Sequence, residues 1–404
     1  MIVSIKVKIL IAILLFCIIF NSCSFVEDSS SQTTGVKKIE SSHEISDDVD
    51  YIKNPIDIKE NNQWSLNNQG IYPSYSNNGM AWEFDERKAC KGCDINYSDF
   101  SLYSKRDCTV AVIDTSVNVL HTDYQNIWHN ANEIIDDNID NDNNAFVDDY
   151  YSWNFVADNN AVCDDSGSDY SIHGNLMVGV LCAHNDNFTG IFNNTKCNVM
   201  CIQAIDGRNL KGDVDDVIKA IEYAQDNGAK ICCMAFSTYV YSEELENAIR
   251  SSDMLFVVPS GNDGFELDEN LKVYPACFDY DNCISVADMR CDGNLSIMSN
   301  YSSDFIDVAA PGTDIISTYP DGTYGVESGT SLASAYVTGL AGMVYSCSSK
   351  ELSANQIKRI IINNATVNDI LKDRVKSSGY IDYTKSLLNV IGEWNEEPSL
   401  VSEN

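Results

Sequence analysis

The amino-acid sequence predicts an α/β protein: a three-layer, doubly wound and mainly parallel sheet with helices on both faces. After residue 62, short apolar segments alternate with stretches in which apolar residues recur at helical spacing. The short segments are apolar at nearly every position, which is typical of strands buried on both faces. With 404 residues and a hydrophobic content of 44%, the chain is long and apolar enough for a large core. We therefore expect one domain over residues 62–392.

Four strands and two helices can be placed from these patterns. The runs TVAVI, NVMCIQ, KICCMA and MLFVV predict strands, and the second periodic stretch between them predicts a helix that Gly228 ends. Functional groups of parallel sheets gather where the strands end. Asp114 ends the first strand and Asn262 follows the fourth, so we expect both at one edge of the sheet. The strands are expected at 109–113, 198–203, 230–235 and 254–258, and the helices at about 173–183 and 214–227.

Residues 1–22 predict an export signal. Lysines precede an apolar run at 9–20, which is short for a membrane-spanning helix of about 20 residues. The run ends in Phe-Asn-Ser-Cys, which resembles the lipobox of bacterial lipoproteins, where the cysteine, here Cys23, carries the lipid. Because Phe20 stands where leucine is usual, an ordinary cleaved signal and an uncleaved anchor remain open. We expect a cell-surface lipoprotein or a secreted protein that meets the membrane only through Cys23.

Composition limits the partners. Residues 23–61 are rich in Ser, Asp, Glu and Lys with little apolar periodicity, which predicts a disordered spacer, and residues 393–404 read as a loose acidic tail. The net charge of −34 excludes nucleic acid and anionic lipid as partners, because phosphates are bound by Lys and Arg. Such a charge suits a soluble exported protein that binds cations. We expect a monomer.

The chain contains 15 cysteines, which in an exported protein suggests disulfides. Several, such as Cys201, lie in apolar strand-like runs, where cysteine acts as a small buried hydrophobe. The pairs that flank polar loops, Cys90 with Cys93 and Cys277 with Cys283, are the better disulfide candidates. No second cysteine pair follows Cys90-x-x-Cys93 at zinc-binding spacing, so zinc is not favoured.

The segment SGTSLASAYVTGLAGMV at 328–344 places Ser331 in the first turn of an apolar helix. Ser331 is then either a helix-capping serine or a nucleophile at a helix start, where unpaired N–H groups favour negative charge. Asp114 at a strand end and His173 at the start of an apolar helix have similarly ordinary interpretations, as turn-forming or capping residues. No one of these segments decides the question alone.

Together these segments resemble the subtilisin-like serine proteases, or subtilases. VAVIDTS resembles the strand-Asp motif of that family and HGNLMVGVLCA its His-Gly-Thr helix. SGTSLASAYVTG resembles its Gly-Thr-Ser-Met-Ala helix, and FVVPSGNDG the segment that bears its oxyanion asparagine. The order Asp114, His173, Asn262, Ser331 is the subtilase order, unlike that of other serine hydrolases. The resemblance covers about 62–390 and implies a subtilisin-like fold.

The resemblance implies a serine endopeptidase that acts on polypeptides. Ser331 would attack the peptide carbonyl, and His173 would take its proton and pass it to the leaving amine. Asp114 would orient the imidazole. The side-chain amide of Asn262 and the backbone N–H of Ser331 would stabilise the oxyanion.

Several residues depart from the family pattern without removing a catalytic group. In the stretch that resembles the substrate-pairing strand, Ser237 replaces glycine and should narrow the entrance of the specificity pocket. We therefore expect narrow specificity. The departures also keep open an alternative from another class, a catalytically silent subtilase-like surface binding module. The departing residues are Ser116, Asn175, Ala235, Ser237 and Ala335.

The acidic stretch NEIIDDNIDNDNNAFVDDYYSWNF resembles an insert found in many subtilases, some of which bind Ca²⁺ there. It begins like an EF-hand loop but fails that pattern at Ala145 and Tyr151. A solvated loop is the alternative interpretation. A bound Ca²⁺ would be structural, since the chemistry needs no cofactor. The candidate ligands are Asp137, Asp140, Asp142, Asn144 and Asp148.

Overall fold

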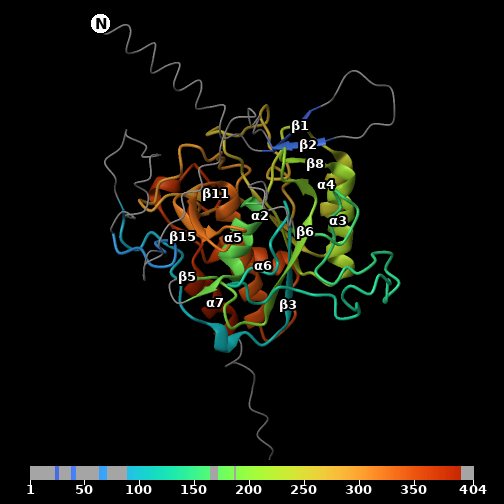
Figure 1. Ribbon diagram of the computed structural model, residues 1–404. Helices are drawn as coiled ribbons and strands as arrows, with labels where there is room; N and C mark the ends of the chain where they lie inside the picture. The colour runs from blue at the N-terminus through green and yellow to red at the C-terminus, as the bar shows by residue number, and fades with distance from the viewer. Residues whose placement is uncertain are drawn as a thin grey trace, which may run out of the picture.

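The computed structural model describes residues 63–70, 89–163, 172–185 and 188–392, together with the backbone of 23–26 and 38–41 (Figure 1). At its centre is an eight-stranded sheet in the order β15-β16-β12-β11-β10-β9-β3-β6. Neighbouring strands run parallel except β15 and β16, which pair antiparallel. The strands are β3 (Cys108–Asp114), β6 (Cys197–Gln203), β9 (Ile231–Met234), β10 (Leu255–Pro259), β11 (Cys283–Met289), β12 (Val308–Pro311), β15 (Thr366–Val367) and β16 (Gly379–Tyr380).

Helices cover both faces of this sheet. α2, α5, α6 and α7 contribute to the core on one face, and α3 and α4 to the core on the other, at the right of Figure 1. The mainly parallel three-layer arrangement predicted from the sequence is therefore confirmed. The helices are α2 (Ile172–Cys182), α3 (Val214–Asp226), α4 (Glu243–Ser251), α5 (Thr330–Cys347), α6 (Ala354–Asn363) and α7 (Tyr383–Gly392).

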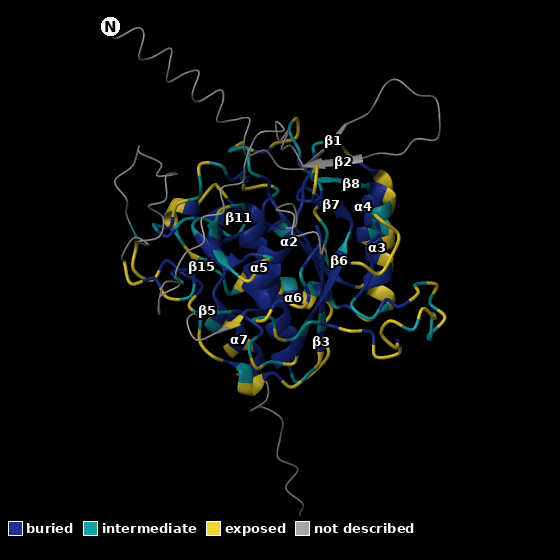
Figure 2. Cartoon of the chain, in the orientation of Figure 1, coloured by how far each residue is buried: buried dark blue, intermediate teal, exposed yellow. Residues whose placement is uncertain are grey.

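The uniformly apolar strands are explained by burial on both sides. In β3, Val110 and Val112 face one core and Ala111 and Ile113 face the other. All four side chains are inaccessible to solvent, and the inner strands β9 to β12 and the helix α5 are buried at every residue (Figure 2). Successive side chains of a strand point to opposite faces, so a strand in a middle layer needs an apolar residue at every position.

The central helix α5 is buried at every residue, which explains its small and apolar composition. A Cβ atom on Gly339 would lie 2.8 Å from the Tyr383 hydroxyl, and one on Gly342 would lie 2.7 Å from the ring of Phe192. These glycines let α5 approach its neighbours closely, so the helix and the nucleophile candidate at its start are held firmly against the sheet.

The predicted strands and helices are all present, with ends that differ by at most a few residues. The helix α3 begins after Asp213, whose side chain accepts the N–H of Asp215, and it is followed by Gly228 at φ +81°. Both are ordinary helix-end devices. Gly228 therefore acts as predicted.

The segment expected to be a disordered spacer contains two strands. β1 (Cys23–Val26) pairs with β2 (Lys38–Ser41), and β2 pairs with β8 (Lys211–Asp213), which pairs with β7 (Ile205–Asp206). Such pairing uses main-chain hydrogen bonds and needs no apolar periodicity, so composition gave no sign of it. The rest of the expected spacer, the export signal at 1–22 and the tail at 393–404 lie outside the described residues.

Among the thirteen cysteines whose side chains the structure describes, no two are joined by a disulfide. Cys90 is exposed and Cys93 buried, and their thiols are hydrogen-bonded to each other. Cys277 and Cys283 are both buried. In the part of the chain that the structure describes, no helix combines the length and apolar character needed to cross a membrane.

Candidate active site

Asp114 and His173 are brought together where β3 ends and α2 begins. The Nδ1 atom of His173 lies 2.8 and 2.9 Å from the two carboxylate oxygens of Asp114. Asp114 is 2% exposed, and the N–H of Thr115 donates to the same carboxylate at 2.6 Å. A buried carboxylate that accepts these hydrogen bonds fixes the imidazole with its proton on Nδ1. This leaves Nε2 as the basic nitrogen.

The glycine after His173 is required by the way α2 docks. A Cβ on Gly174 would lie 2.8 Å from the carbonyl oxygen of Thr115, and the N–H of Gly174 donates to the Thr115 hydroxyl at 3.0 Å. The start of α2 therefore rests directly on the loop that follows Asp114. This contact sets the distance between the carboxylate and the imidazole.

The pKa of His173 is raised above its usual value. Burial acts to lower this pKa, but the charge and hydrogen bond of Asp114 and the charge of Glu327 outweigh it. The side chain of His173 is 37% exposed, so the imidazole remains within reach of a ligand. Negative charge beside an imidazole favours the protonated ring that a proton-accepting base must become.

Ser331 lies in the first turn of α5 but is not its N-cap. The N-cap is Gly329, which has no side chain to cap the helix. The Ser331 hydroxyl instead donates to the carbonyl oxygen of Ala235 at 3.1 Å. The capping interpretation of Ser331 is therefore wrong, because its side chain points away from the helix N–H groups.

Strand register places Ser331 beside Asp114. Ile113 pairs with Met234 between the parallel strands β3 and β9, so the next residues, Asp114 and Ala235, lie next to each other at the carboxyl edge of the sheet. Ser331 contacts Ala235 and His173 contacts Asp114. Two elements far apart in the sequence, α2 and α5, thus deliver an imidazole and a hydroxyl to one short stretch of sheet edge.

Asn262 joins the same edge from the end of β10. Its side-chain oxygen accepts hydrogen bonds from the N–H and the hydroxyl of Thr330, both at 2.9 Å. The side-chain nitrogen of Asn262 would lie 3.5 Å from a Cβ on Gly329, so glycine keeps the space beside the amide open. The contacts of Asp114 with His173, of Ser331 with Ala235 and of Asn262 with Thr330 thus lie along one edge of the sheet, and the catalytic roles of the four residues stay a prediction.

The residues that depart from the subtilase pattern are buried around this edge. Asn175 is inaccessible, and its side-chain oxygen accepts the N–H of Asn118 at 3.0 Å, which ties α2 to the loop after β3. Ser237 is 1% exposed, and its hydroxyl has no hydrogen-bond partner among the described residues. Ser116 and Ala335 are also buried.

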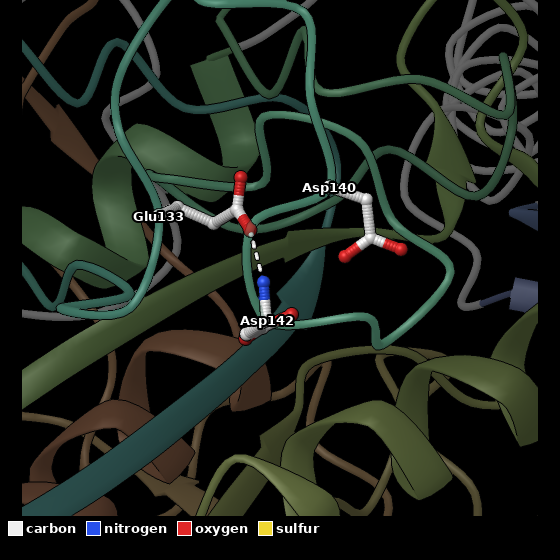
Figure 3. Close-up of side chains that lie close together, drawn as sticks. All are labelled: Glu133, Asp140 and Asp142. Atoms are coloured by element: carbon white, nitrogen blue, oxygen red, sulfur yellow. Dashed lines mark hydrogen bonds between the residues drawn. The ribbon is translucent and has the colours of Figure 1, made fainter.

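The acidic insert forms a cluster that differs from the predicted one. Carboxylate oxygens of Glu133, Asp140 and Asp142 lie within 4.8 Å of one another (Figure 3). Asp137 and Asp148 accept backbone N–H groups of the loop. Asp140 and Asp142 are therefore the two predicted ligands in the cluster.

Asn144 braces this loop. Its side-chain amide donates to Asp142 at 3.3 Å and to Asp149 at 3.0 Å. Its side-chain oxygen accepts the N–H of Phe146 at 2.7 Å. With both ends of its amide engaged in these bonds, Asn144 acts as a brace in this structure, and the prediction of Asn144 as a ligand stays a prediction.

Glu133 is the cluster member that the sequence analysis missed. It is 5% exposed, its Oε1 accepts the N–H of Asn141 at 2.7 Å, and its Oε2 is buried without a hydrogen-bond partner in the described part of the chain. A buried carboxylate oxygen without a partner is costly, and a cation would remove that cost. The available signal was a lone glutamate in the apolar stretch before the acidic run.

The chain is similar in sequence to known proteases. A model described as the subtilase family matches residues 105–382. The chain is 30% identical over 310 residues to subtilisin-like protease 1 of Plasmodium berghei, across 71% of this chain and 50% of that protein. It is 33% identical over 217 residues to thermitase of Thermoactinomyces vulgaris, across 53% of this chain and 72% of that protein. The chain thus spans about half the length of the Plasmodium relative.

Solved structures give the same fold at lower sequence identity. A lanthipeptide protease matches with a TM-score of 0.54 and 21% identity, over 70% of this chain and 88% of that chain. The protease domain of PatA matches with a TM-score of 0.56 and 19% identity, over 72% of this chain and 98% of that chain. At these identities the likeness concerns the fold.

Proposed function

The chain belongs to the subtilase family of serine proteases, and on that basis we propose that it is a serine endopeptidase that cleaves polypeptides with Ser331, His173 and Asp114. The observation that carries the proposal is the two-oxygen contact of Asp114 with His173 beside the residue that Ser331 contacts. A nucleophile, a base and an orienting carboxylate at one sheet edge are the parts that acyl transfer needs.

In the proposed reaction, Ser331 attacks the peptide carbonyl while Nε2 of His173 accepts the hydroxyl proton. The attack forms a C–O bond, and the same imidazolium then protonates the leaving amine as the C–N bond breaks. Water repeats the sequence on the acyl-enzyme. In the resting structure the Ser331 hydroxyl is bonded to Ala235, so a rotation of its side chain precedes attack. Catalytic hydrogen bonds often form only when substrate is present.

The oxyanion would be held by Asn262 and the start of α5. Because Thr330 engages the side-chain oxygen of Asn262, the side-chain nitrogen is the atom that donates towards the substrate. Asn262 accepts the N–H of Thr330 and the N-cap Gly329 has no side chain, so we assign the second donor to the N–H of Ser331. Donors that are fixed before the charge develops stabilise the transition state most.

We propose Ca²⁺ as a structural ion for the cluster of Glu133, Asp140 and Asp142. Hard carboxylate oxygens suit this ion, and the buried Oε2 of Glu133 is an oxygen that only a cation or a donor would satisfy. When bound, Ca²⁺ would hold the acidic loop in place. It would take no part in bond cleavage.

We also propose that the chain is exported, as a lipoprotein anchored at Cys23 or as a secreted protein, and acts as a monomer. The support is the sequence of residues 1–23. Fractionation of cells that express the full chain or Cys23→Ala tests the anchor. Membrane association that Cys23→Ala abolishes supports the lipid, and equal association of both chains contradicts it.

Turnover distinguishes the protease from the alternative, a silent binding module in the same cleft. Purified chain is incubated with a library of quenched peptides, with Ser331→Ala as the control. The protease cleaves peptides, and the Ser331→Ala variant binds them without cleavage. Peptide binding by the unaltered chain with no cleavage would favour the binding module.

A further inference from the structure

A short hairpin lies against the helix that carries His173. β13 (Ile315–Thr318) pairs antiparallel with β14 (Tyr324–Glu327). The hydroxyl of Thr318 donates to the carbonyl oxygen of Asn175 at 3.0 Å, and that of Ser317 donates to the carbonyl oxygen of Leu176 at 2.6 Å. The hairpin is therefore fastened to the first turns of α2, next to the imidazole.

The hairpin ends in a carboxylate that lies four residues before Ser331. Glu327 is the last residue of β14 and stands just before the loop that leads to Ser331. Burial raises the pKa of Glu327, and the hydrogen bond of Tyr319 and the charge of His173 act against this rise. The charge of Glu327 in turn contributes to the raised pKa of His173. The described residues contain no ion pair that involves Glu327. This carboxylate thus has no lysine or arginine of the described chain to neutralise it.

The position of Glu327 is held by a side chain from across the hairpin. The Tyr319 hydroxyl donates to Oε1 of Glu327 at 2.8 Å. The Tyr319 ring crosses Gly325 so closely that any Cβ there would overlap it. Glycine at 325 therefore makes room for the tyrosine, and the tyrosine fixes the carboxylate through Oε1.

Which part of a substrate meets Glu327 follows from the chemistry of His173. In the proposed function, on which this inference rests, His173 gives its proton to the leaving amine. The residue that carries this amine, the first one after the scissile bond, must then lie beside the imidazole. A carboxylate beside the imidazole also lies beside the side chain of that residue.

We propose that Glu327 makes the site select a basic residue, lysine or arginine, immediately after the scissile bond. The ammonium or guanidinium group pairs with the carboxylate that Tyr319 holds in place. An acidic residue at the same position meets like charge and is disfavoured. Glu327 is then a specificity-determining residue, and Tyr319 is a positioning residue that acts through it.

Three peptides test this proposal. Each carries the same sequence around one cleavage site found by library profiling and differs only in the residue after the scissile bond: Lys, Gln or Glu. We expect kcat/KM of the native chain to be at least tenfold higher for Lys than for Glu. In Glu327→Gln this ratio should fall about three- to tenfold, and in Glu327→Lys it should invert.

A matched control removes the same charge elsewhere. Glu222 is exposed on α3, on the other face of the sheet, and Glu222→Gln should leave the ratio unchanged. Loss of charge beside His173 changes the rate for every substrate, whereas only a contact with the substrate changes the ratio. Tyr319→Phe should lower the ratio by a smaller factor and leave the cleavage position unchanged.

Two results would overturn the proposal: an equal Lys-to-Glu ratio in the native chain and in Glu327→Gln, or an equal fall in Glu222→Gln. Failure of the protease proposal is seen separately, as absence of cleavage of every library peptide. The three peptides are then made from a library peptide that Ser331→Ala binds, with Lys, Gln or Glu placed at each position in turn. In that case the dissociation constants of the same peptides for Ser331→Ala and for Ser331→Ala with Glu327→Gln decide the inference. A Lys preference that the second substitution removes supports it, and its absence contradicts it.

Discussion

The side-chain oxygen of Asn262 accepts two hydrogen bonds from Thr330, the residue directly before Ser331. This contact links the end of β10 to the start of α5, so the oxyanion donor and the nucleophile are positioned by one another. It also decides which end of the amide faces the substrate. Since the oxygen is directed at Thr330, the nitrogen is the end of the amide that we propose donates to the carbonyl that Ser331 attacks.

Replacement of Asn262 by alanine should therefore slow the chemistry more than it weakens binding. We expect kcat to fall about 100- to 1000-fold with a KM changed less than about threefold, a magnitude carried over from subtilisin. Steady-state kinetics on one quenched peptide measure both constants. Circular dichroism of the variant controls for folding. A kcat within twofold of the native value would contradict the proposed role of Asn262 in stabilising the oxyanion.

The acidic cluster should make stability depend on Ca²⁺. A ligand present at about 100 times its dissociation constant stabilises a fold by about 2.7 kcal/mol, so the melting temperature should rise when Ca²⁺ is added. In Glu133→Gln most of this rise should disappear, because the buried oxygen that faces the ion becomes an amide. Thermal melts with Ca²⁺ and with a chelator check this.

Asp136 offers the control for that experiment. It is an exposed acidic residue of the same loop and lies outside the cluster, so Asp136→Asn should keep the full rise in melting temperature. Equal loss in Asp136→Asn and Glu133→Gln would point to the net charge of the loop instead of a site. If the melting temperature of the native chain does not change when Ca²⁺ is added, the proposed calcium site is ruled out.

Activity should fall on the acid side as His173 gains a proton. His173 accepts the Ser331 proton only when neutral, so kcat/KM rises with pH through the pKa of His173. Burial lowers this pKa, but Asp114 and Glu327 raise it overall, so the midpoint should lie above the usual value of about 6.5. Glu327→Gln removes a negative charge and should move the midpoint to lower pH by roughly half a unit.

A pH profile of kcat/KM for a peptide with a neutral residue after the scissile bond measures this midpoint. The neutral peptide keeps the substrate contact of Glu327 out of the result. Glu222→Gln serves again as the charge-matched control. A midpoint that stays in place or moves to higher pH in Glu327→Gln would mean that the carboxylate does not act on His173.

Ser237 should restrict which side chain fits before the scissile bond. By resemblance to subtilases it lies in the substrate-pairing stretch, and its buried hydroxyl has no hydrogen-bond partner among the described residues. Ser237→Gly removes this group and should raise kcat/KM for a bulky aromatic residue before the scissile bond by about tenfold, with little change for alanine. Peptides that differ only at this position provide the measurement. Equal gains for both would indicate a general change in rate.

Local patterns allowed the strands and the four catalytic candidates to be predicted because each signal is continuous in the sequence. Asp114 ends an apolar run and Ser331 opens one, and the carboxyl edge of a parallel sheet brings such positions together. The role of Ser331 at the helix start could not be settled in this way. Its side chain turns to Ala235, the residue directly after β9.

The residues that were missed depend on contacts between distant segments. Glu133 lies near the start of the acidic stretch, and only the fold of the loop carries it to Asp140 and Asp142. The position of Glu327 depends on the docking of the β13–β14 hairpin on α2, which no periodicity in the sequence predicts. Strands β1 and β2 depend on pairing with β8. Tertiary contacts of this kind have no counterpart in composition or spacing.

Covalent labelling with a fluorophosphonate tests the central claim most directly, because this probe reacts with a serine that an adjacent base activates. Mass spectrometry of the labelled, folded chain should find one modified peptide, with the probe on Ser331. Labelling should vanish in Ser331→Ala and fall at least a hundredfold in His173→Ala. A folded native chain that takes up no probe, or that is labelled at another residue regardless of His173, would contradict the account.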